Sequence, residues 1–202
     1  MSDISPLRIA LLIGSTRPDR FADVPARWLL EGAAERDDLT LDVLDLRDYR
    51  LPFYGEPHSA ASATHDAVAA WRHAVAQADG YIVTAAEYNH APTAVLKNAL
   101  DHGTTEWHRK PIGFVGYGGV GGARAVEHLR HIAVELQMAP IKVAIHIAGD
   151  IFSSIKSGRT DLDAYPHFAT GRTMFFDQLV WWGRALRAGR ERDRRELMQA
   201  AS

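Results

Sequence analysis

The sequence predicts a doubly wound α/β sandwich, in which a five-stranded parallel sheet is covered by helices on both faces. Apolar, strand-like runs alternate with helical patterns along the chain, and this alternation is typical of parallel βαβ units. Right-handed crossovers between such strands place helices on both faces of the sheet. The length of 202 residues, without an internal repeat or a low-complexity linker, predicts one domain over residues 1–202.

The first half of the chain contains three predicted strands separated by two helices. Residues 7–13 form a nearly continuous apolar run with one charge, as expected of a buried strand. Residues 25–35 have helical spacing, and residues 39–46 alternate apolar and polar side chains like a second strand. Residues 64–78 are again helical, and residues 80–86 form a third strand.

The second half continues the alternation with three helices and two strands. Helical spacing appears at residues 93–102, 123–137 and 173–188. The strands between these helices are predicted at residues 110–117 and 142–147.

Two segments depart from this alternation. Residues 149–171 form a long connection with few core candidates, and long connections in compact domains are usually functional or bound to a partner. Residues 187–195 carry charges of both signs, which predicts a solvated extension of the last helix.

The bulk composition excludes several classes of function. A net charge of −2 gives no global field for binding nucleic acid or an anionic membrane. No apolar run approaches the ~18 residues that span a bilayer. The chain contains no cysteine, which excludes disulfides, iron–sulfur clusters and thiolate chemistry and fits a cytoplasmic protein. His128 and His131 lie on one predicted helix, but no loop residue is indicated as a third metal ligand, so no metal site is predicted.

The loop after the first predicted strand reads GSTRPDRFAD, residues 14–23. In doubly wound sheets, ligands bind at the carboxyl ends of the strands near the point where strand order reverses. Gly14 permits a sharp turn, Ser15 offers a hydroxyl group, and Arg17 and Arg20 offer guanidinium forks for phosphate oxygens. Together with the N-terminus of the following helix, these residues predict a phosphate site. The alternative interpretation is a capped turn with surface arginines.

Polar side chains follow the third strand at residues 87–90, which read EYNH. Tyr88 brings an apolar ring with a polar tip, Asn89 brings donors and an acceptor, and His90 brings two ring nitrogens. This set suits a flat heteroaromatic ligand. The alternative interpretation is that Asn89 caps the helix that Pro92 opens, while Tyr88 packs against the protein.

The loop after the fourth strand, residues 116–122, reads GYGGVGG and contains a G-x-G-x-x-G match. The dinucleotide fingerprint belongs to the first strand and needs a carboxylate about 20 residues further on, whereas residues 136–145 hold none. We therefore expect the glycines to bring backbone groups close to the edge of a flat ring. A flexible turn is the alternative.

Taken together, GSTR after the first strand and EYNHAPTAVLKNALDH after the third resemble the NADPH-dependent FMN reductase family of flavodoxin-like proteins, over about residues 7–188. The resemblance implies a flavodoxin-like sheet with strand order 2-1-3-4-5. It implies that the FMN phosphate is held by Ser15, Arg17, Phe21 and Ala22, with Arg20 in the same loop. It implies that the isoalloxazine ring lies against Glu87, Tyr88, Asn89 and His90, and its pyrimidine edge against Tyr117, Gly118 and Gly119. The chain departs from the family at Ala86, usually proline, and at Ala91, often a serine with a helix-capping hydroxyl.

By the same resemblance, the chain is an oxidoreductase that passes hydride from NADPH or NADH through FMN to a small acceptor, such as flavin, quinone, azo dye or metal oxyanion. His90 is a candidate for proton transfer near the ring. The family resemblance also implies a homodimer or homotetramer, with residues 52–57 and the segment after residue 149 as interface or substrate-facing surfaces. Two alternatives stay open, a flavodoxin-type electron carrier and a non-catalytic flavin-binding protein. The near-neutral charge and the arginines of the first loop disfavour the carrier.

Overall fold

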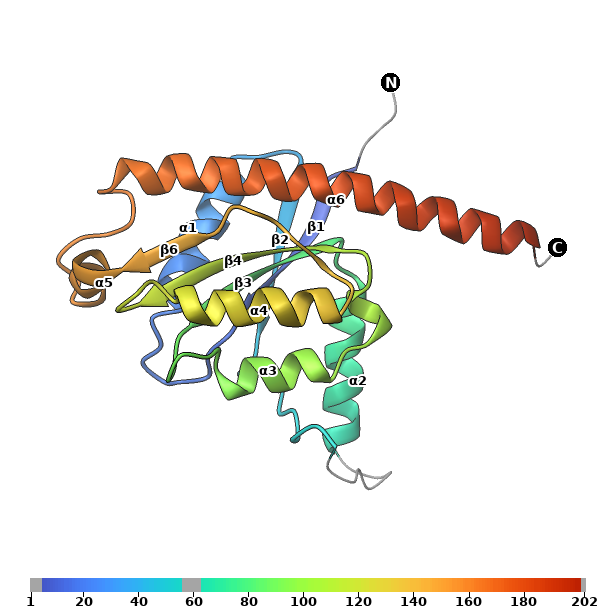
Figure 1. The fold of residues 1–202 in the computed structure, drawn as a ribbon, viewed down its shortest axis with the longest axis horizontal. Coiled ribbons are helices and arrows are strands. Elements are labelled where there is room, and N and C mark those ends of the chain that lie inside the picture. The colour runs from blue at the N-terminus through green and yellow to red at the C-terminus, as the bar shows by residue number, and fades with distance from the viewer. Residues whose placement is uncertain (1–4, 56–62, 201–202) are drawn as a thin grey trace.

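A parallel sheet lies between two layers of helices in the computed structural model, which describes residues 5–55 and 63–200 (Figure 1). The strands are β1 (Leu7–Ile13), β2 (Leu39–Asp45), β3 (Gly80–Ala86), β4 (Pro111–Gly118), β5 (Ala139–Pro140) and β6 (Ile145–Ala148). The α-helices are α1 (Asp23–Ala34), α2 (Ala63–Ala76), α3 (Ala94–Asp101), α4 (Ala123–Glu135), α5 (Gly149–Lys156) and α6 (Pro166–Ala200). A short 3-10 helix, η1 (Thr105–Trp107), precedes β4. The predicted strand order, β2-β1-β3-β4-β5, is confirmed.

The helices divide between the two faces because successive side chains of each strand point to opposite sides. In β1, Leu7, Ile9, Leu11 and Ile13 join the core cluster that contains residues of α1, α5 and α6. Leu12 of the same strand lies in the other cluster, with residues of α2, α3 and α4. Figure 1 shows α1 and α6 on one side of the sheet and α3 and α4 on the other.

The last position of the sheet differs in detail from the single strand predicted at residues 142–147. It is filled by β5 and β6, which both pair with β4 but leave a gap between them. In this gap, side chains form hydrogen bonds with backbone groups that are not paired with β4. Arg130 donates to the carbonyl oxygens of Ile141 and Lys142, and the Val143 N–H donates to the side chain of Gln178. These partners come from α4 and α6, so the break depends on tertiary contacts.

The connection predicted at residues 149–171 is largely helical, which corrects that expectation. It contains α5 and the beginning of α6. Pro166 occupies the first position of α6, which suits proline because a backbone N–H there would have no partner within the helix. The final helix therefore runs from residue 166 to residue 200 rather than over 173–188. The charged stretch at 187–195 is part of it, but Arg187 and Arg190 are mostly buried and pair with Asp79. The solvated extension was thus wrong for these two arginines.

The topology brings three loops together at one edge of the sheet. β1 lies between β2 and β3. The connection after β1 leads to β2 on one side, and the connection after β3 leads to β4 on the other side. The loops that follow β1, β3 and β4 consequently start at the same, carboxyl edge, beside the point where strand order reverses.

Candidate functional site

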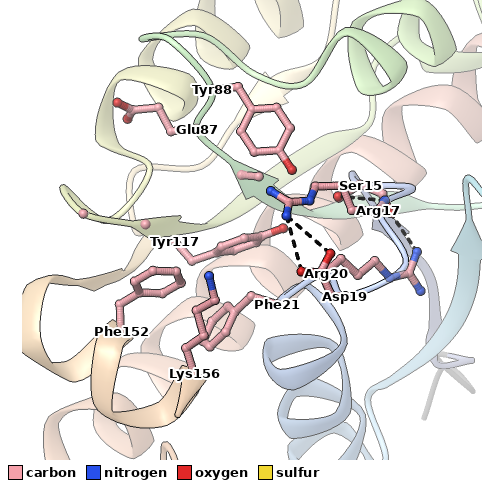
Figure 2. A pocket seen from close by; sticks show the side chains of 13 residues that line it. Ser15, Arg17, Asp19, Arg20, Phe21, Glu87, Tyr88, Tyr117, Phe152 and Lys156 are labelled. Carbon is pink, nitrogen blue, oxygen red and sulfur yellow. Dashed lines mark hydrogen bonds and ion pairs between the residues drawn. The ribbon is translucent and has the colours of Figure 1, made fainter.

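A cleft with a volume of about 240 Å³ opens at the carboxyl edge of the sheet (Figure 2). Three loops supply most of its lining, and α5 supplies the rest. We call it the three-loop cleft and define it by its lining residues: Ser15, Arg17, Asp19, Arg20, Phe21, Ala86, Glu87, Tyr88, Tyr117, Gly118, Gly119, Phe152 and Lys156. Nine of the twelve predicted cofactor-binding residues belong to this set; the other three are Ala22, Asn89 and His90.

The first loop lies tightly against the third strand. Gly14 donates to the carbonyl oxygen of Thr84 at 3.2 Å, and a Cβ atom at Gly14 would lie 2.5 Å from that oxygen, so only glycine fits. The Thr93 hydroxyl donates to the Gly14 carbonyl at 2.5 Å. These contacts hold Ser15, which is almost completely buried, at the inner end of the cleft. Ala22, buried beneath the loop, immediately precedes α1.

Arg17 lies at the mouth of the cleft with its guanidinium mostly exposed. A hydrogen bond with the Tyr88 side chain and the charge of Asp19 raise the pKa of Arg17 above its ordinary value. The contact between Arg17 and Asp19 measures 3.3 Å to both carboxylate oxygens. Because an exposed ion pair of this kind contributes little, the Arg17 guanidinium can exchange Asp19 for another anion.

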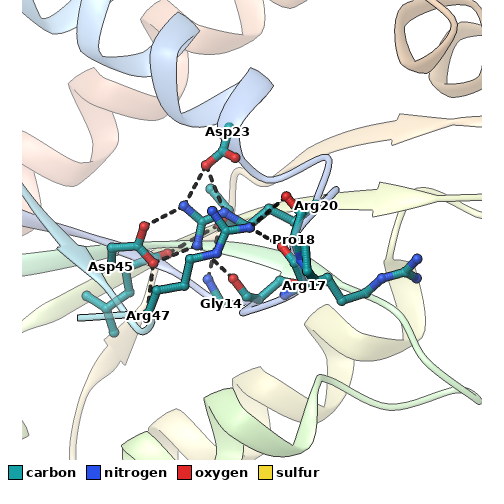
Figure 3. A network of polar contacts seen from close by, with 10 residues as sticks. Gly14, Arg17, Pro18, Arg20, Asp23, Asp45 and Arg47 are labelled. Carbon is teal, nitrogen blue, oxygen red and sulfur yellow. Dashed lines mark hydrogen bonds and ion pairs between the residues drawn. The ribbon is translucent and has the colours of Figure 1, made fainter. Parts of the chain in front are cut away.

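Arg20 lines the same cleft but has its guanidinium engaged elsewhere (Figure 3). It donates to both oxygens of Asp45 at 2.6 and 2.5 Å, to Asp23 at 2.8 Å and to the Ser15 carbonyl at 2.8 Å. Its side chain is only 4% exposed. The hydrogen bonds that Arg20 donates to Asp45 outweigh burial and raise the pKa of Arg20 above its ordinary value. Arg47 also donates to the carbonyl oxygens of residues 17 and 18, so this network fixes the first loop to the end of β2.

The second loop is a tight turn at residues 88–91. Tyr88 and Ala91 exchange backbone hydrogen bonds at 2.9 and 3.1 Å. Asn89 and His90, between them, have φ values of 50° and 71°, in the left-handed region that non-glycine residues rarely occupy. Such strain clusters at functional sites, where the surrounding structure holds it in place.

The start of α3 also differs from the expectation. The helix begins at Ala94 rather than at Pro92, and its cap is Thr93, whose hydroxyl accepts from the Leu96 N–H at 3.2 Å. Asn89 is therefore not the cap, and Thr93 supplies the capping hydroxyl that Ala91 lacks.

Glu87 and His90 point towards α4 rather than into the cleft. The Arg124 backbone N–H and Nε donate to the Glu87 carboxylate at 3.1 and 2.5 Å. Arg124 Nη1 lies 2.8 Å from His90 Nε2. Burial raises the pKa of Glu87, but the hydrogen bonds and charge of Arg124 outweigh it, so the net pKa lies below its ordinary value. Figure 2 shows the Glu87 carboxylate turned away from the side chains of the first loop.

The third loop places a buried phenol in the cleft. The Tyr117 ring lies 5.2 Å from the Phe21 ring and stacks on Phe152 at 6.4 Å, measured between centroids. Tyr117 Oη is buried and has no hydrogen-bond partner in the described part of the chain. Burial raises the pKa of this phenol, which therefore remains a protonated donor. Gly118 has a φ of 134°, and a Cβ at Gly122 would lie 2.8 Å from the Tyr117 nitrogen, which explains the glycines around Tyr117.

Sequence reasoning missed Phe152 and Lys156, which lie four residues apart on α5. A signal was available, because α5 directly follows β6 and the carboxyl end of that strand faces the same edge as β4. The assignment of residues 149–171 to a loop concealed the helical i, i+4 spacing.

Other site types find no support over residues 5–55 and 63–200. No group of three or more histidine, aspartate or glutamate side chains there could hold a metal ion. No helix in this part of the chain is long and apolar enough to cross a membrane.

Comparisons with known proteins show which family this chain resembles. A sequence model of the NADPH-dependent FMN reductase family matches residues 7–150. An NAD(P)H-dependent FMN reductase from Nectria sp is 34% identical over 164 residues, covering 75% of this chain and 82% of the relative. A 2-hydroxy-1,4-benzoquinone reductase from Burkholderia sp is 33% identical over 139 residues, covering 65% of this chain and 73% of the relative.

Solved structures show the same fold. The flavoenzyme FerB from Paracoccus denitrificans, an NAD(P)H:(acceptor) oxidoreductase, superposes with a TM-score of 0.66 at 21% identity. The match covers 89% of this chain and 98% of FerB.

Proposed function

The chain belongs to the NADPH-dependent FMN reductase family and is an oxidoreductase that uses FMN and NAD(P)H, and from this premise we propose that the three-loop cleft is its flavin site. One observation supports this assignment above the others. Tyr117 Oη is a buried donor without a partner in the described chain, and it lies where three strand-end loops meet. A buried hydroxyl without a partner costs about 1–3 kcal/mol, which a ligand oxygen would recover.

The phosphate of FMN binds, in this proposal, beside the first loop. Ser15 and Arg17 supply a hydroxyl and a guanidinium, and Phe21 and Ala22 place the positive end of α1 next to them. Arg20 acts indirectly, because its guanidinium is held by Asp45. We assign Arg20 the role of fixing the loop that carries the phosphate contacts.

The second and third loops would hold the isoalloxazine ring. Tyr88 lines the cleft with its ring, and Gly118 and Gly119 offer backbone groups with no side chain in the way. Glu87, Asn89 and His90 contribute through the shape of the turn and its anchor on Arg124. Proton transfer by His90 stays a prediction.

When bound, FMN would supply the redox chemistry, namely hydride acceptance from NAD(P)H and electron delivery to an acceptor. The chain's residues orient the cofactor and provide its electrostatic surroundings. We propose a small quinone as the acceptor, on the strength of the benzoquinone reductase relative.

We further propose that the chain acts in the cytoplasm as a homodimer or homotetramer. Exposed aromatic side chains at Phe53 and Tyr54, 69% and 63% exposed, support an oligomer interface close to α3. The remainder of that predicted surface, residues 56 and 57, lies outside the described residues. Light scattering on the purified protein tests the oligomeric state.

The central experiment measures flavin binding and turnover together. The purified chain is expected to carry or take up FMN, identified after denaturation, and to oxidise NADPH or NADH in the presence of a quinone. A monodisperse protein that shows no bound flavin absorbance after addition of excess FMN would contradict the proposed site.

A further inference from the structure

The fourth wall of the three-loop cleft comes from α5, whose residues Phe152 and Lys156 lie beyond the family match at residues 7–150. Phe152 packs edge-on against Phe21, with 4.8 Å between ring centroids, and stacks on Tyr117. Phe21 belongs to the first loop, so this contact holds α5 against the end of the cleft assigned to the phosphate. The Lys156 ammonium lies 5.8 Å from the centre of the Phe152 ring, a distance typical of a cation–π contact.

The charges that line the cleft are unequally matched. Arg17 is paired with Asp19, and Arg20 is paired with Asp45. Glu87 is paired with Arg124. Lys156 has no carboxylate within ion-pair distance in the described part of the chain, so it gives the cleft a positive charge that a ligand can neutralise.

We propose that Lys156 binds the phosphate monoester of the flavin and sets the preference of the site for FMN over riboflavin. An ammonium group on a flexible stem serves as a compact point charge for phosphate oxygens. Phe152 acts as a positioning residue, because its ring holds the ammonium near the first loop. This inference rests on the proposed flavin site and adds a determinant of specificity to it.

The test compares two flavins that differ only in the phosphate. FMN and riboflavin are titrated into the full chain, after bound flavin has been removed by dialysis, and flavin fluorescence reports binding. In Lys156→Met, the affinity for FMN is expected to fall about three- to tenfold, the range of a partly exposed charge-assisted contact, while riboflavin affinity is unchanged. Lys156→Arg retains the charge and is expected to keep most of the FMN preference. Lys142→Met, an exposed lysine that does not line the cleft, serves as the control.

Each other outcome overturns the inference in a recognisable way. Equal losses for FMN and riboflavin would show that Lys156 supports the cleft rather than the phosphate. An unchanged FMN affinity with a raised KM for NADPH, but not for NADH, would move the contact to the 2′-phosphate of the hydride donor. An unmodified chain that binds neither flavin would overturn the proposed function and this inference together, whereas equal FMN affinity of the unmodified chain and Lys156→Met would overturn the inference alone.

Discussion

Two buried tyrosines lie at opposite ends of the parallel strands, one at the amino ends (the amino edge) and one at the carboxyl ends (the carboxyl edge). Their hydroxyl groups have very different surroundings. Tyr81, at the start of β3, is fully buried, and its hydroxyl donates to the carbonyl oxygens of Val75 and Glu106 at 3.0 Å and accepts from Lys110 at 3.1 Å. Tyr117, near the end of β4, is 5% exposed, and its hydroxyl has no partner in the described chain. The same side chain therefore completes a hydrogen-bond network at one edge and has, among the described residues, an unpaired hydroxyl group at the other.

The neighbours of each tyrosine follow the same division. At the amino edge, Lys110 donates to the last carbonyl oxygens of α2, at residues 75 and 76, and Arg190 pairs with Asp79 at 3.0 Å. At the carboxyl edge, the ion pair of Arg17 with Asp19 is largely exposed, and Tyr117 keeps a buried donor without a partner in the described part of the chain. Satisfied networks stabilise a fold, whereas buried polar groups without a partner are candidate positions for binding a ligand.

The largest expected effect comes from removing a charge at the amino edge. Asp79→Asn leaves Arg187 and Arg190, both mostly buried, without their carboxylate partner, and Arg190 also feels the charge of Lys110. We expect the free energy of unfolding to fall by about 3 kcal/mol, as when one partner of a buried ion pair is lost. Urea unfolding measures the loss, and FMN affinity is expected to stay unchanged because the cleft lies at the other edge.

Asp42→Asn provides the matched control for that loss. Asp42 pairs with Arg8 at 2.8 Å, but both side chains are about half exposed, so its removal is expected to cost less than about 1 kcal/mol. If the free energy of unfolding fell by the same amount in both variants, the buried ion pairs of Asp79 would contribute no more than a surface ion pair, which would contradict the prediction.

The second prediction concerns the pH dependence of the amino edge. Burial, followed by the charge of Arg190, lowers the pKa of Lys110 to about 8 from an ordinary value of 10.5. Between these two pH values the unfolded chain binds more protons than the folded chain, so the contribution of Lys110 to stability rises with pH. From pH 8, where the folded-state lysine is half protonated, to pH 9.5, this gain amounts to about 1.5 kcal/mol.

Lys110→Met isolates this contribution. The difference in unfolding free energy between the unmodified chain and Lys110→Met is expected to move in favour of the unmodified chain as pH rises from 8 to 9.5. A constant difference over this window would mean that Lys110 has the same pKa in the folded and unfolded chains, and that its hydrogen bonds to α2 compensate fully for burial.

The sequence predicts the positions of the strands and loops better than the partners of the side chains in them. Apolar patterning locates the first four strands within one residue and places Ser15, Tyr88 and Tyr117 at or just after their carboxyl ends, because a local run of apolar side chains requires no knowledge of distant partners. It cannot show that Arg20 is held by Asp45, 25 residues away, or Glu87 by Arg124, 37 residues away. Both residues have the right type for ligand contacts, and only the folded arrangement shows that their side chains are committed elsewhere.

A similar limit explains why α5 was missed. The helix is only eight residues long, so its three apolar residues, Ile151, Phe152 and Ile155, are too few to establish a helical period in the sequence. The significance of Phe152 and Lys156 emerges only when β6 pairs with β4 and brings α5 against Phe21. The break between β5 and β6 was missed for the same reason, since Arg130 and Gln178 compensate for it from distant helices.

The smallest expected effect separates the two tyrosines directly. Tyr117→Phe removes a buried hydroxyl without a protein partner, so the flavin-free chain is expected to keep its stability or gain up to about 1 kcal/mol, while FMN affinity falls about tenfold. Tyr81→Phe removes a hydroxyl with three partners, so stability is expected to fall by about 1–2 kcal/mol while FMN affinity is unchanged. Urea unfolding and flavin titration of the same two variants give all four values. If Tyr117→Phe were less stable but bound FMN with unchanged affinity, the Tyr117 hydroxyl would be a structural group like that of Tyr81. The proposed contrast between the two edges would then be wrong.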